Sequence, residues 1–317
     1  EQGPQGRLEE EVQPGTRLRG GAPVLQLGQP GGSRIPAGVP LPQCSQALEE
    51  ETALLLREFE HRLPIQGELI NADARQCYTD FSIGTGKPSG ARGVFEGQRA
   101  YLTQGVPQYL MDFLPPTQQF TVAEWRDKAL IAVRGISSRD HLPIVVGGTG
   151  LYIKGLIDNL AFPKVEPKPE FRAAFEKKPL DELVKLLLRL DPAAAEVVDL
   201  KNPRRVIRAL EVTTFTGKPF TAQQIVGSPT VEAFQVGIKW SREELNRRID
   251  EEIEDMIERG WIDEIRDIIA KSIPLDAPAM TAIGYRELLA YIKGEKSLEA
   301  AIQTCKVAVH RYAKRQE

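Results

Sequence analysis

The chain has few of the residues that build disulfide frameworks or metal sites. Its 317 residues include only three cysteines, Cys44, Cys77 and Cys305, and three scattered histidines. The cysteine spacing matches neither a zinc motif nor a set of disulfide pairs, which is typical of a protein that works in a reducing cytosol. We expect the histidines to be surface or packing residues rather than metal ligands.

Long apolar runs and a strong net charge are also missing. No segment approaches the roughly 20 apolar residues that span a bilayer, and we see no signal peptide. The net charge of −3 at pH 7 gives no overall attraction to nucleic acid or to an anionic membrane. A polyanionic partner would therefore have to be held by local basic patches. We expect a cytoplasmic protein with no membrane association.

Residues 1–86 contain no lysine, and Lys87 is the first lysine of the chain. Residues 1–44 instead contain nine glycines and seven prolines and show little periodicity, which predicts an irregular, atypical N-terminal segment. Within it, "PVLQLG" at residues 23–28 is a plausible strand. From about residue 45, apolar residues at helical spacing indicate a helix.

The remaining chain alternates between strand and helix patterns. The segments "GELINA" (67–72), "LPIVVGG" (142–148) and "FQVGIKW" (234–240) are typical of strands, the second of them buried on both faces. Capped helices begin after Thr121 and Ser241, each followed three residues later by a glutamate. This alternation predicts a parallel α/β sheet.

A mostly helical segment interrupts the α/β pattern. We therefore predict an α/β core at residues 45–160 and 231–317, with C-terminal helices. The inserted helical domain is expected at residues 161–230.

Three glycines follow the buried strand in "PIVVGGTGLYIKGL" (143–156). A strand that runs into glycines and then into a helix directs backbone N–H groups beyond the strand end, and a helix N-terminus favours an anion. Gly147, Gly148 and Gly150 leave the backbone open, and Thr149 adds a hydroxyl. The pattern indicates an anion-binding loop, although a tight strand-to-helix turn with close packing explains the glycines equally well.

An acidic residue closes the preceding strand in "NADARQCYTDFSIGTGKP" (71–88). The carboxyl ends of parallel strands line ligand crevices, so Asp73 is a candidate general base. A helix cap or a turn is the alternative role. The second glycine turn, at residues 83–88, carries Lys87, which could neutralise a phosphate.

Basic side chains gather in two helical segments. Arg204 and Arg208 share a helix face in "NPRRVIRALEV" (202–212), with Arg205 beside them. The C-terminal helix repeats lysine and arginine at helical spacing, as expected of a stripe along an RNA backbone. A solvated basic face is the alternative for both.

Taken in this order, the segments resemble the tRNA dimethylallyltransferases, also called tRNA isopentenyltransferases. The family strings "ADSRQVY", "DIGTAKP", "FTVA", "VGGTGLYI", "NPRRxIRALEV", "AIGYRE" and "AKRQ" have counterparts between residues 45 and 317. The resemblance implies a P-loop NTPase-like parallel sheet with helices on both faces and an inserted helical domain that grips the anticodon stem.

The resemblance also implies an activity. Members transfer a dimethylallyl group from dimethylallyl pyrophosphate to N6 of an adenine adjacent to the tRNA anticodon, with Mg²⁺ as cofactor. The implied partner is the anticodon stem-loop of tRNA, and we expect the chain to act as a monomer.

The family pattern assigns roles to individual residues. Asp73 accepts a proton from the adenine amine, and Thr149 helps the leaving oxygen to depart. The pyrophosphate is expected to contact Gly147, Gly148, Thr149 and Arg248. The residues expected to contact tRNA are Asp73, Ala74, Arg75, Gln76, Arg204, Arg205, Arg208, Gly284, Tyr285, Arg286, Lys314, Arg315 and Gln316.

One family element is missing from the sequence. The family begins with a phosphate-binding loop, a strand followed by G-x-x-x-x-G-K-[ST], whose lysine and hydroxyl meet the pyrophosphate and Mg²⁺. Residues 23–40 lack this motif, and no realignment can supply its lysine. Either this segment is an altered reading frame joined to a genuine enzyme, or the chain is a catalytically impaired paralogue that binds tRNA.

Two further alternatives concern the substrate and the reaction. An isopentenyltransferase that acts on free adenine nucleotides would need neither the helical insertion nor the basic C-terminal helix. A P-loop kinase is disfavoured by the missing lysine.

Glu252 stands one turn after Arg248, where the family would place a second arginine, and a carboxylate there would repel pyrophosphate.

Overall fold

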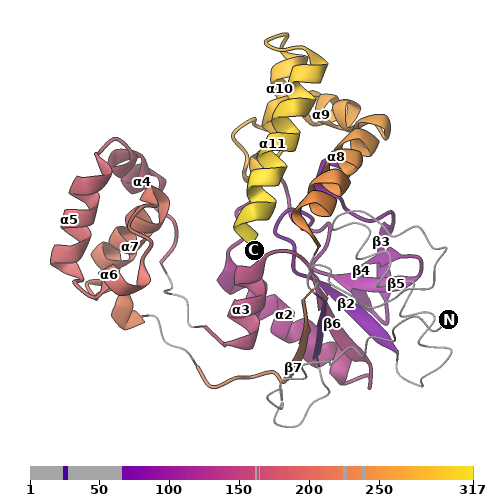
Figure 1. Ribbon diagram of the computed structural model, residues 1–317. Helices are drawn as coiled ribbons and strands as arrows, with labels where there is room; N and C mark the ends of the chain where they lie inside the picture. Colours follow the sequence, from indigo (N-terminus) through magenta and orange to yellow (C-terminus); the bar gives the residue numbers. More distant parts are fainter. Residues whose placement is uncertain are drawn as a thin grey trace, which may run out of the picture. The chain divides into compact units, whose positions relative to one another are not determined.

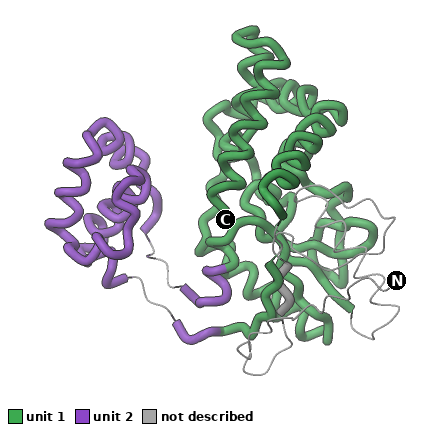
Figure 2. The backbone as a smooth tube through the Cα atoms, in the orientation of Figure 1, with its two compact units in different colours: residues 1–153, 230–317 green, residues 154–229 purple. Residues whose placement is uncertain are grey.

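The computed structural model describes residues 24–27, 66–160, 163, 165–223, 227–237 and 240–316. The helix predicted from residue 45 and most of the segment 1–44 lie outside these residues. The chain divides into two compact units (Figure 2). The core unit comprises residues 1–153 and 230–317, and the helical unit comprises residues 154–229. The helical unit overlaps the predicted insertion at residues 161–230, whose role in binding tRNA stays a prediction.

One sheet organises the described part of the core unit (Figure 1). Its seven strands follow the order β3-β4-β5-β2-β6-β1-β7. Their bounds are β1 Val24–Leu27, β2 Gly67–Asn71, β3 Ala91–Phe95, β4 Gln98–Thr103, β5 Val106–Tyr109, β6 Leu142–Val146 and β7 Ala233–Val236. β5, β2, β6, β1 and β7 run parallel, whereas β3 and β4 add an antiparallel extension to β5.

The central strands β2 and β6 are covered on both faces of the sheet. All five residues of β2 and four of the five residues of β6 are buried, as expected for parallel strands in the middle of an α/β sheet. β1 lies between β6 and β7 and is parallel to both, so the strand predicted at residues 23–28 is confirmed in its backbone.

The carboxyl ends of β2 and β6 lie level with each other. In the parallel register Asn71 is paired with Val146. The residues that follow these two positions therefore leave the same edge of the sheet side by side. This places the segment beginning at Ala72 next to the one beginning at Gly147.

Helix α2 (Val122–Ser137) packs on β2 and β6. Its predicted capping box is confirmed, because the Thr121 hydroxyl accepts from the Glu124 backbone N–H and the Glu124 carboxylate accepts from the Thr121 N–H. The Trp125 indole N–H donates to the Asn71 carbonyl oxygen at 2.8 Å. The same indole stacks on Tyr152 in α3 (Gly150–Ile157), with ring centroids 4.7 Å apart. The end of β2 is thus fastened to a buried aromatic pair.

The C-terminal helices pack together as a group (Figure 1). They are α8 (Arg242–Glu258), α9 (Trp261–Ala270), the short helix η3 (Pro278–Thr281), α10 (Tyr285–Ile292) and α11 (Leu298–Gln316). Their shared core includes Trp261 and Tyr285 and takes in Phe81 from the segment that follows β2. The predicted cap of α8 is confirmed, since the Ser241 hydroxyl accepts from the Glu244 backbone N–H at 3.2 Å.

The helical unit has a core of its own. It consists of α4 (Pro169–Glu176), α5 (Leu180–Leu190), α6 (Ala194–Val197), α7 (Pro203–Thr216) and the short helix η2 (Thr221–Gln223). Leucines of α5 and α7 pack in its centre. Among the helices that the structure describes in either unit, none combines the length and the apolar character needed to cross a bilayer.

The buried carboxylate of Glu68 on β2 joins side chains from β5 and from the segment between α2 and β6. Glu68 on β2 is 1% exposed and accepts from the Arg139 guanidinium at 3.0 and 2.8 Å, from the Tyr109 hydroxyl at 2.5 Å, and contacts His141 Nδ1 at 2.6 Å. Burial by itself raises the pKa of Glu68, but the hydrogen bonds from Arg139, Tyr109 and His141 outweigh it and place the pKa below its usual range.

Removing this charge should destabilise the core unit. We expect Glu68→Gln to lower the free energy of unfolding by about 3 kcal/mol, because Arg139 would be left without its buried partner. A depressed carboxylate pKa adds stability above the pKa of the unfolded chain, and that stability is lost as the pH falls through the folded pKa. The difference in melting temperature between wild type and E68Q should therefore shrink on acidification, which thermal unfolding at several pH values measures. A constant difference would contradict this account.

Candidate active site

The segments after β2 and β6 are joined by three hydrogen bonds. The Ala72 backbone N–H donates to the Val146 carbonyl at 2.6 Å, and the Thr149 N–H donates to the Ala72 carbonyl at 3.0 Å. The Ala74 N–H donates to the Thr149 hydroxyl oxygen at 3.0 Å. The two residues that the sequence singled out, Asp73 and Thr149, therefore lie at the same edge of the sheet in directly bonded segments.

The carboxylate of Asp73 combines a turn-capping role with an available oxygen. Its Oδ1 accepts from the Arg75 N–H at 2.7 Å and from the Gln76 N–H at 3.4 Å, which is the turn role that the sequence left open. Within the described residues, Oδ2 receives no hydrogen bond. Burial raises the pKa of Asp73 above its usual range, despite these two N–H donors. A carboxylate with a raised pKa is a stronger base than an ordinary aspartate.

Thr149 presents a hydroxyl that can still donate. Its oxygen accepts from Ala74, so its proton is available for an acceptor beyond the strand end. Thr149 also precedes α3, whose N-terminus adds positive potential, although the Gly150 and Tyr152 N–H groups already donate to the Gly148 and Thr149 carbonyls. This arrangement suits an anionic oxygen that binds just beyond the loop.

Gly147 is required by a close approach of two backbones. It has a φ of 150°, and a Cβ there would lie 2.4 Å from the Ala72 carbonyl carbon and 2.6 Å from the Asp73 nitrogen. The close-packing explanation of the glycines is therefore correct at this position. The packing is also what brings the loop of Thr149 against the segment of Asp73.

The structure predicts different effects for two alanine substitutions in this loop. Gly147→Ala should displace the end of β2 and lower the free energy of unfolding by about 1–3 kcal/mol. Gly150→Ala is the matched control, because a Cβ at Gly150 meets nothing within 4 Å. Equal melting temperatures for wild type and Gly147→Ala would contradict the described geometry.

Two more segments reach this edge of the sheet. The Arg75 guanidinium donates to the Thr281 hydroxyl at 2.8 Å and to the Pro278 carbonyl at 3.3 Å. From the end of α11, the Gln316 amide donates to the Gly148 carbonyl at 3.0 Å. Four stretches that the sequence singled out separately, around residues 73, 148, 281 and 316, thus meet within the core unit.

The exposed part of this region is basic. Lys314 and Arg315 are exposed at the end of α11. They are next in sequence to Gln316, which contacts residues 147–150, the glycine loop. Arg286 is exposed at the start of α10, whereas Gly284 and Tyr285 are buried. A direct contact between RNA and the Tyr285 side chain, which is 0% exposed, does not fit this packing. Arg286 remains a candidate for such a contact.

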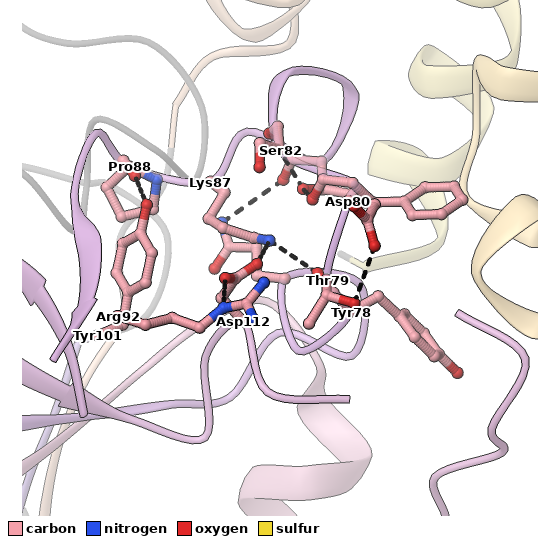
Figure 3. Close-up of polar contacts among 12 residues, drawn as sticks. Tyr78, Thr79, Asp80, Ser82, Lys87, Pro88, Arg92, Tyr101 and Asp112 are labelled. Carbon is pink, nitrogen blue, oxygen red and sulfur yellow. Dashed lines mark hydrogen bonds and ion pairs between the residues drawn. The ribbon is translucent and has the colours of Figure 1, made fainter. Parts of the chain in front are cut away.

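The second glycine turn is not a phosphate site, which corrects the sequence-based suggestion for Lys87. The ammonium of Lys87 is buried. It donates to the Tyr78 carbonyl at 2.7 Å and is paired with Asp112 (Figure 3). Asp112 also accepts from Arg92 at 2.5 Å. Burial lowers the pKa of Lys87 below its usual range, although Asp112 opposes this. The lysine anchors the segment that follows β2 instead of facing a ligand.

The backbone N–H groups of the same turn already hold an anion that belongs to the protein. In η1 (Ile83–Thr85), the N–H groups of Ser82 and Ile83 each donate to Glu264 Oε2 at 2.7 Å, and that of Gly84 donates to Oε1 at 3.2 Å. A phosphate could not bind there without displacing this carboxylate.

Arg248 lies on α8, which follows the carboxyl end of β7 at the same edge of the sheet. Its guanidinium stacks over Trp240 at 3.8 Å from the ring centroid and donates to Glu244 at 2.6 Å. Glu252, whose charge we expected to repel pyrophosphate, accepts from Arg259 at 3.0 Å. This ion pair offsets the negative charge of Glu252, while Arg248 itself is 8% exposed and paired with Glu244. The contact between Arg248 and pyrophosphate stays a prediction.

The remaining predicted tRNA contacts lie in the helical unit, on α7. Arg204 and Arg205 are exposed. Arg208 donates to Glu211 at 2.7 Å, and Arg172 makes two further hydrogen bonds to the same carboxylate. Burial raises the pKa of Glu211, but the bonds from Arg172, Lys168 and Arg208 outweigh it and lower the pKa to about 2. Arg208 is therefore held at the surface by a buried carboxylate.

Known proteins resemble this chain over most of its length. A family model described as IPP transferase matches residues 76–317. The tRNA dimethylallyltransferase of Thermomicrobium roseum is 39% identical over 262 residues, which cover 81% of this chain and 77% of that protein. The chain belongs to the tRNA dimethylallyltransferase family. A second member, from Roseiflexus, is 36% identical over 84% of each chain.

Solved members of the family confirm the predicted P-loop-like α/β fold. The tRNA isopentenylpyrophosphate transferase of Bacillus halodurans is 31% identical, with a TM-score of 0.57 over 93% of this chain and 85% of that one. A eukaryotic dimethylallyltransferase acting on tRNA has a TM-score of 0.67 over 93% of this chain and 68% of that one. At 24% identity, this second likeness concerns the fold.

Sequence reasoning missed the residues that hold Asp73 in place. The Asn71 side chain accepts from the Asp73 N–H at 2.8 Å and donates to the Leu110 carbonyl at 3.0 Å. An asparagine two residues before an aspartate at a strand end is the local signal for this turn. Glu264 gave no local signal, because it is 182 residues from Ser82.

Proposed function

We propose that the chain transfers a dimethylallyl group from dimethylallyl pyrophosphate to N6 of an adenine adjacent to the tRNA anticodon. The observation that carries the proposal is the direct bonding of the Asp73 and Thr149 segments at the ends of adjacent parallel strands. Membership of the tRNA dimethylallyltransferase family supports the same activity.

Asp73 is proposed to take the proton of the adenine amine. That amine is a poor nucleophile because its lone pair is delocalised into the ring, so loss of its proton must accompany formation of the N–C bond. Oδ1 is occupied by the N–H groups of Arg75 and Gln76, which leaves Oδ2 to face the amine. The raised pKa of Asp73 strengthens it as a base.

The glycine loop is proposed to receive the diphosphate. As the allylic C–O bond breaks, negative charge grows on the leaving oxygen, and donors fixed at that point stabilise it. The Thr149 hydroxyl is the donor that we propose at the strand end, and the N-terminus of α3 adds positive potential there. We propose that the diphosphate contacts the backbone of Gly147 and Gly148, with Arg248 as a neighbouring cation.

Each unit is proposed to contribute residues that bind tRNA. In the core unit these are residues 73–75, Arg286 and residues 314–316. The predicted contact of the Gln76 side chain does not fit the structure, because it is 0% exposed and donates to the Gly86 carbonyl at 2.8 Å. The target base must leave its stack, which costs a few kcal/mol, and arginine side chains can stack on extruded bases. In the helical unit we propose Arg204, Arg205 and Arg208.

The charge distribution supports RNA binding by the helical unit. Residues 154–229 contain 13 lysines and arginines and 10 aspartates and glutamates, a net charge of +3 in a chain whose net charge is −3. A locally positive unit in a weakly negative chain is suited to a phosphate backbone.

Magnesium is proposed to enter with the diphosphate. Within the described residues, no three acidic, histidine or cysteine side chains are placed to hold a metal ion. In phosphate sites Mg²⁺ relies on substrate oxygens and water together with one or two protein ligands. The Thr149 hydroxyl is a candidate ligand, and the ion would supply charge neutralisation to the diphosphate.

A second candidate is a tRNA-binding paralogue with impaired catalysis, favoured by the missing phosphate-loop lysine. A gel-shift titration of an anticodon stem-loop, run beside a prenyl-transfer assay, separates the two. Binding with transfer supports the enzyme, whereas binding without transfer selects the paralogue. We propose that in either case the chain acts as a cytoplasmic monomer.

A further inference from the structure

Glu264 on α9 is the common partner of two turns that are far apart in the sequence. Its carboxylate accepts three backbone N–H groups from residues 82–84. It also accepts the Tyr285 hydroxyl at 2.7 Å, from the first residue of α10. Four donors on one carboxylate make a strong, geometrically fixed junction, since hydrogen bonds to an ionised acceptor are stronger than neutral ones.

The side chains around this junction are tightly packed. Trp261, one turn before Glu264 on α9, lies between glycines of the two turns. A Cβ at Gly84 would be 1.9 Å from its Nε1, and a Cβ at Gly284 would be 2.0 Å from its ring. The indole is 1% exposed. Helix α9 therefore contacts both turns in two ways. The Trp261 indole packs against them, and the Glu264 carboxylate accepts hydrogen bonds from them.

Each turn is connected in its own way to the segment of Asp73. From residues 82–86, the Gly86 carbonyl accepts from the buried Gln76 side chain at 2.8 Å, and the Gln76 backbone N–H points at Asp73 Oδ1. From η3, just before α10, Thr281 accepts from the Arg75 guanidinium at 2.8 Å. Two paths therefore connect Asp73 to Glu264. One runs through Gln76 and the turn at residues 82–86, and the other runs through Arg75, Thr281 and Tyr285. Together they form a closed ring of contacts.

We propose that Glu264 is a positioning residue that fixes the orientation of the Asp73 carboxylate and the place of Arg286. It acts through the turn at residues 82–86 on one side and through Tyr285 on the other. Both Asp73 Oδ1 bonds come from residues 75 and 76, which the two arms of the ring hold. The role of Glu264 in the reaction rests on the proposed function, whereas its mechanical role in the ring does not.

The kinetic test is Glu264→Gln at saturating stem-loop. The amide keeps the length of the side chain but directs its NH₂ group at N–H donors. We expect kcat to fall roughly 10–100-fold, because a small misplacement of a reacting group costs that much. The KM for dimethylallyl pyrophosphate should change little, since the glycine loop is held by β2 and β6. Tyr285→Phe removes one of the four bonds and should have a smaller effect.

Asp263→Asn is the matched control. It removes a carboxylate from the same helix, one whose side chain is 75% exposed and bonded to the exposed Arg266, and it should leave kcat unchanged. A folded E264Q protein with the kcat of wild type would overturn the proposal. A drop in melting temperature with unchanged kcat would show a purely structural role and would overturn it equally.

Hydrogen exchange tests the ring without relying on activity. In E264Q, peptides covering residues 71–78 and 281–287 should exchange faster than in wild type and in D263N, while α2 should not change. Loosening confined to residues 82–86, or none, would overturn the proposal. If the wild type itself transfers no prenyl group, the proposed function fails, and the exchange comparison still decides the role of Glu264.

Discussion

Asp73→Asn should nearly abolish prenyl transfer while the protein still binds tRNA. Asparagine retains an Oδ1 that can accept from Arg75 and Gln76, so the turn should persist. What is lost is the ability to take a proton, and general bases contribute about 10²–10⁴-fold to rate. We therefore expect a fall in kcat of this size and a stem-loop Kd close to that of wild type. Single-turnover transfer and gel-shift titration measure the two quantities.

The pH dependence of the wild type provides a second view of the same carboxylate. A general base acts in its ionised form, so the rate should rise with pH and level off above the pKa of Asp73. Because burial raises this pKa, the acidic limb should lie above the range of an ordinary aspartate. Asp127→Asn, which removes a carboxylate with 65% side-chain exposure on α2, is the control. Equal loss of binding and transfer in D73N would contradict a base role.

Thr149→Val should give the second large effect. Valine has nearly the shape of threonine, so it removes the hydroxyl and little else. The leaving oxygen would lose one fixed donor, which in comparable sites costs about 10²–10³-fold in kcat. The Ala74 N–H, which donates to this hydroxyl, would also lose its partner. Steady-state kinetics with dimethylallyl pyrophosphate as the varied substrate measures the change.

Thr149→Ser separates the hydroxyl from the packing of the methyl group. Serine supplies the same donor and acceptor, so the T149S variant should retain most of the wild-type kcat. If Thr149→Val and Thr149→Ser were equally active, the hydroxyl would have no part in leaving-group departure.

The edge of the sheet could be predicted from the sequence because it depends on local rules. The apolar runs at β2 and β6 identify buried parallel strands, and parallel strands end at a common edge. Asp73 and Thr149 each follow one of these runs, so their proximity is a consequence of topology. The capping residues Thr121 and Ser241 were predictable for the same reason, since a cap and its partner are three residues apart.

The misassigned residues depend on long-range partners that a sequence does not display. A glycine turn followed by Lys87 has the composition of a phosphate site. In the structure, Glu264 fills that turn and Asp112 pairs with the lysine. Tyr285 likewise stands in a motif with an exposed arginine but is buried against Phe81 and Trp261. No local pattern distinguishes a turn whose backbone N–H groups bind a ligand from one whose N–H groups bind a carboxylate of the same chain.

The most direct test of the central claim is a comparison of single-turnover transfer by wild type and D73N. Both are mixed with dimethylallyl pyrophosphate, Mg²⁺ and saturating anticodon stem-loop, and the product nucleoside is identified by mass spectrometry. The account predicts that wild type places one dimethylallyl group on N6 of the adenine adjacent to the anticodon, and that D73N binds the stem-loop and yields almost none. Transfer by D73N at the wild-type rate, or a group attached to another atom, would contradict it.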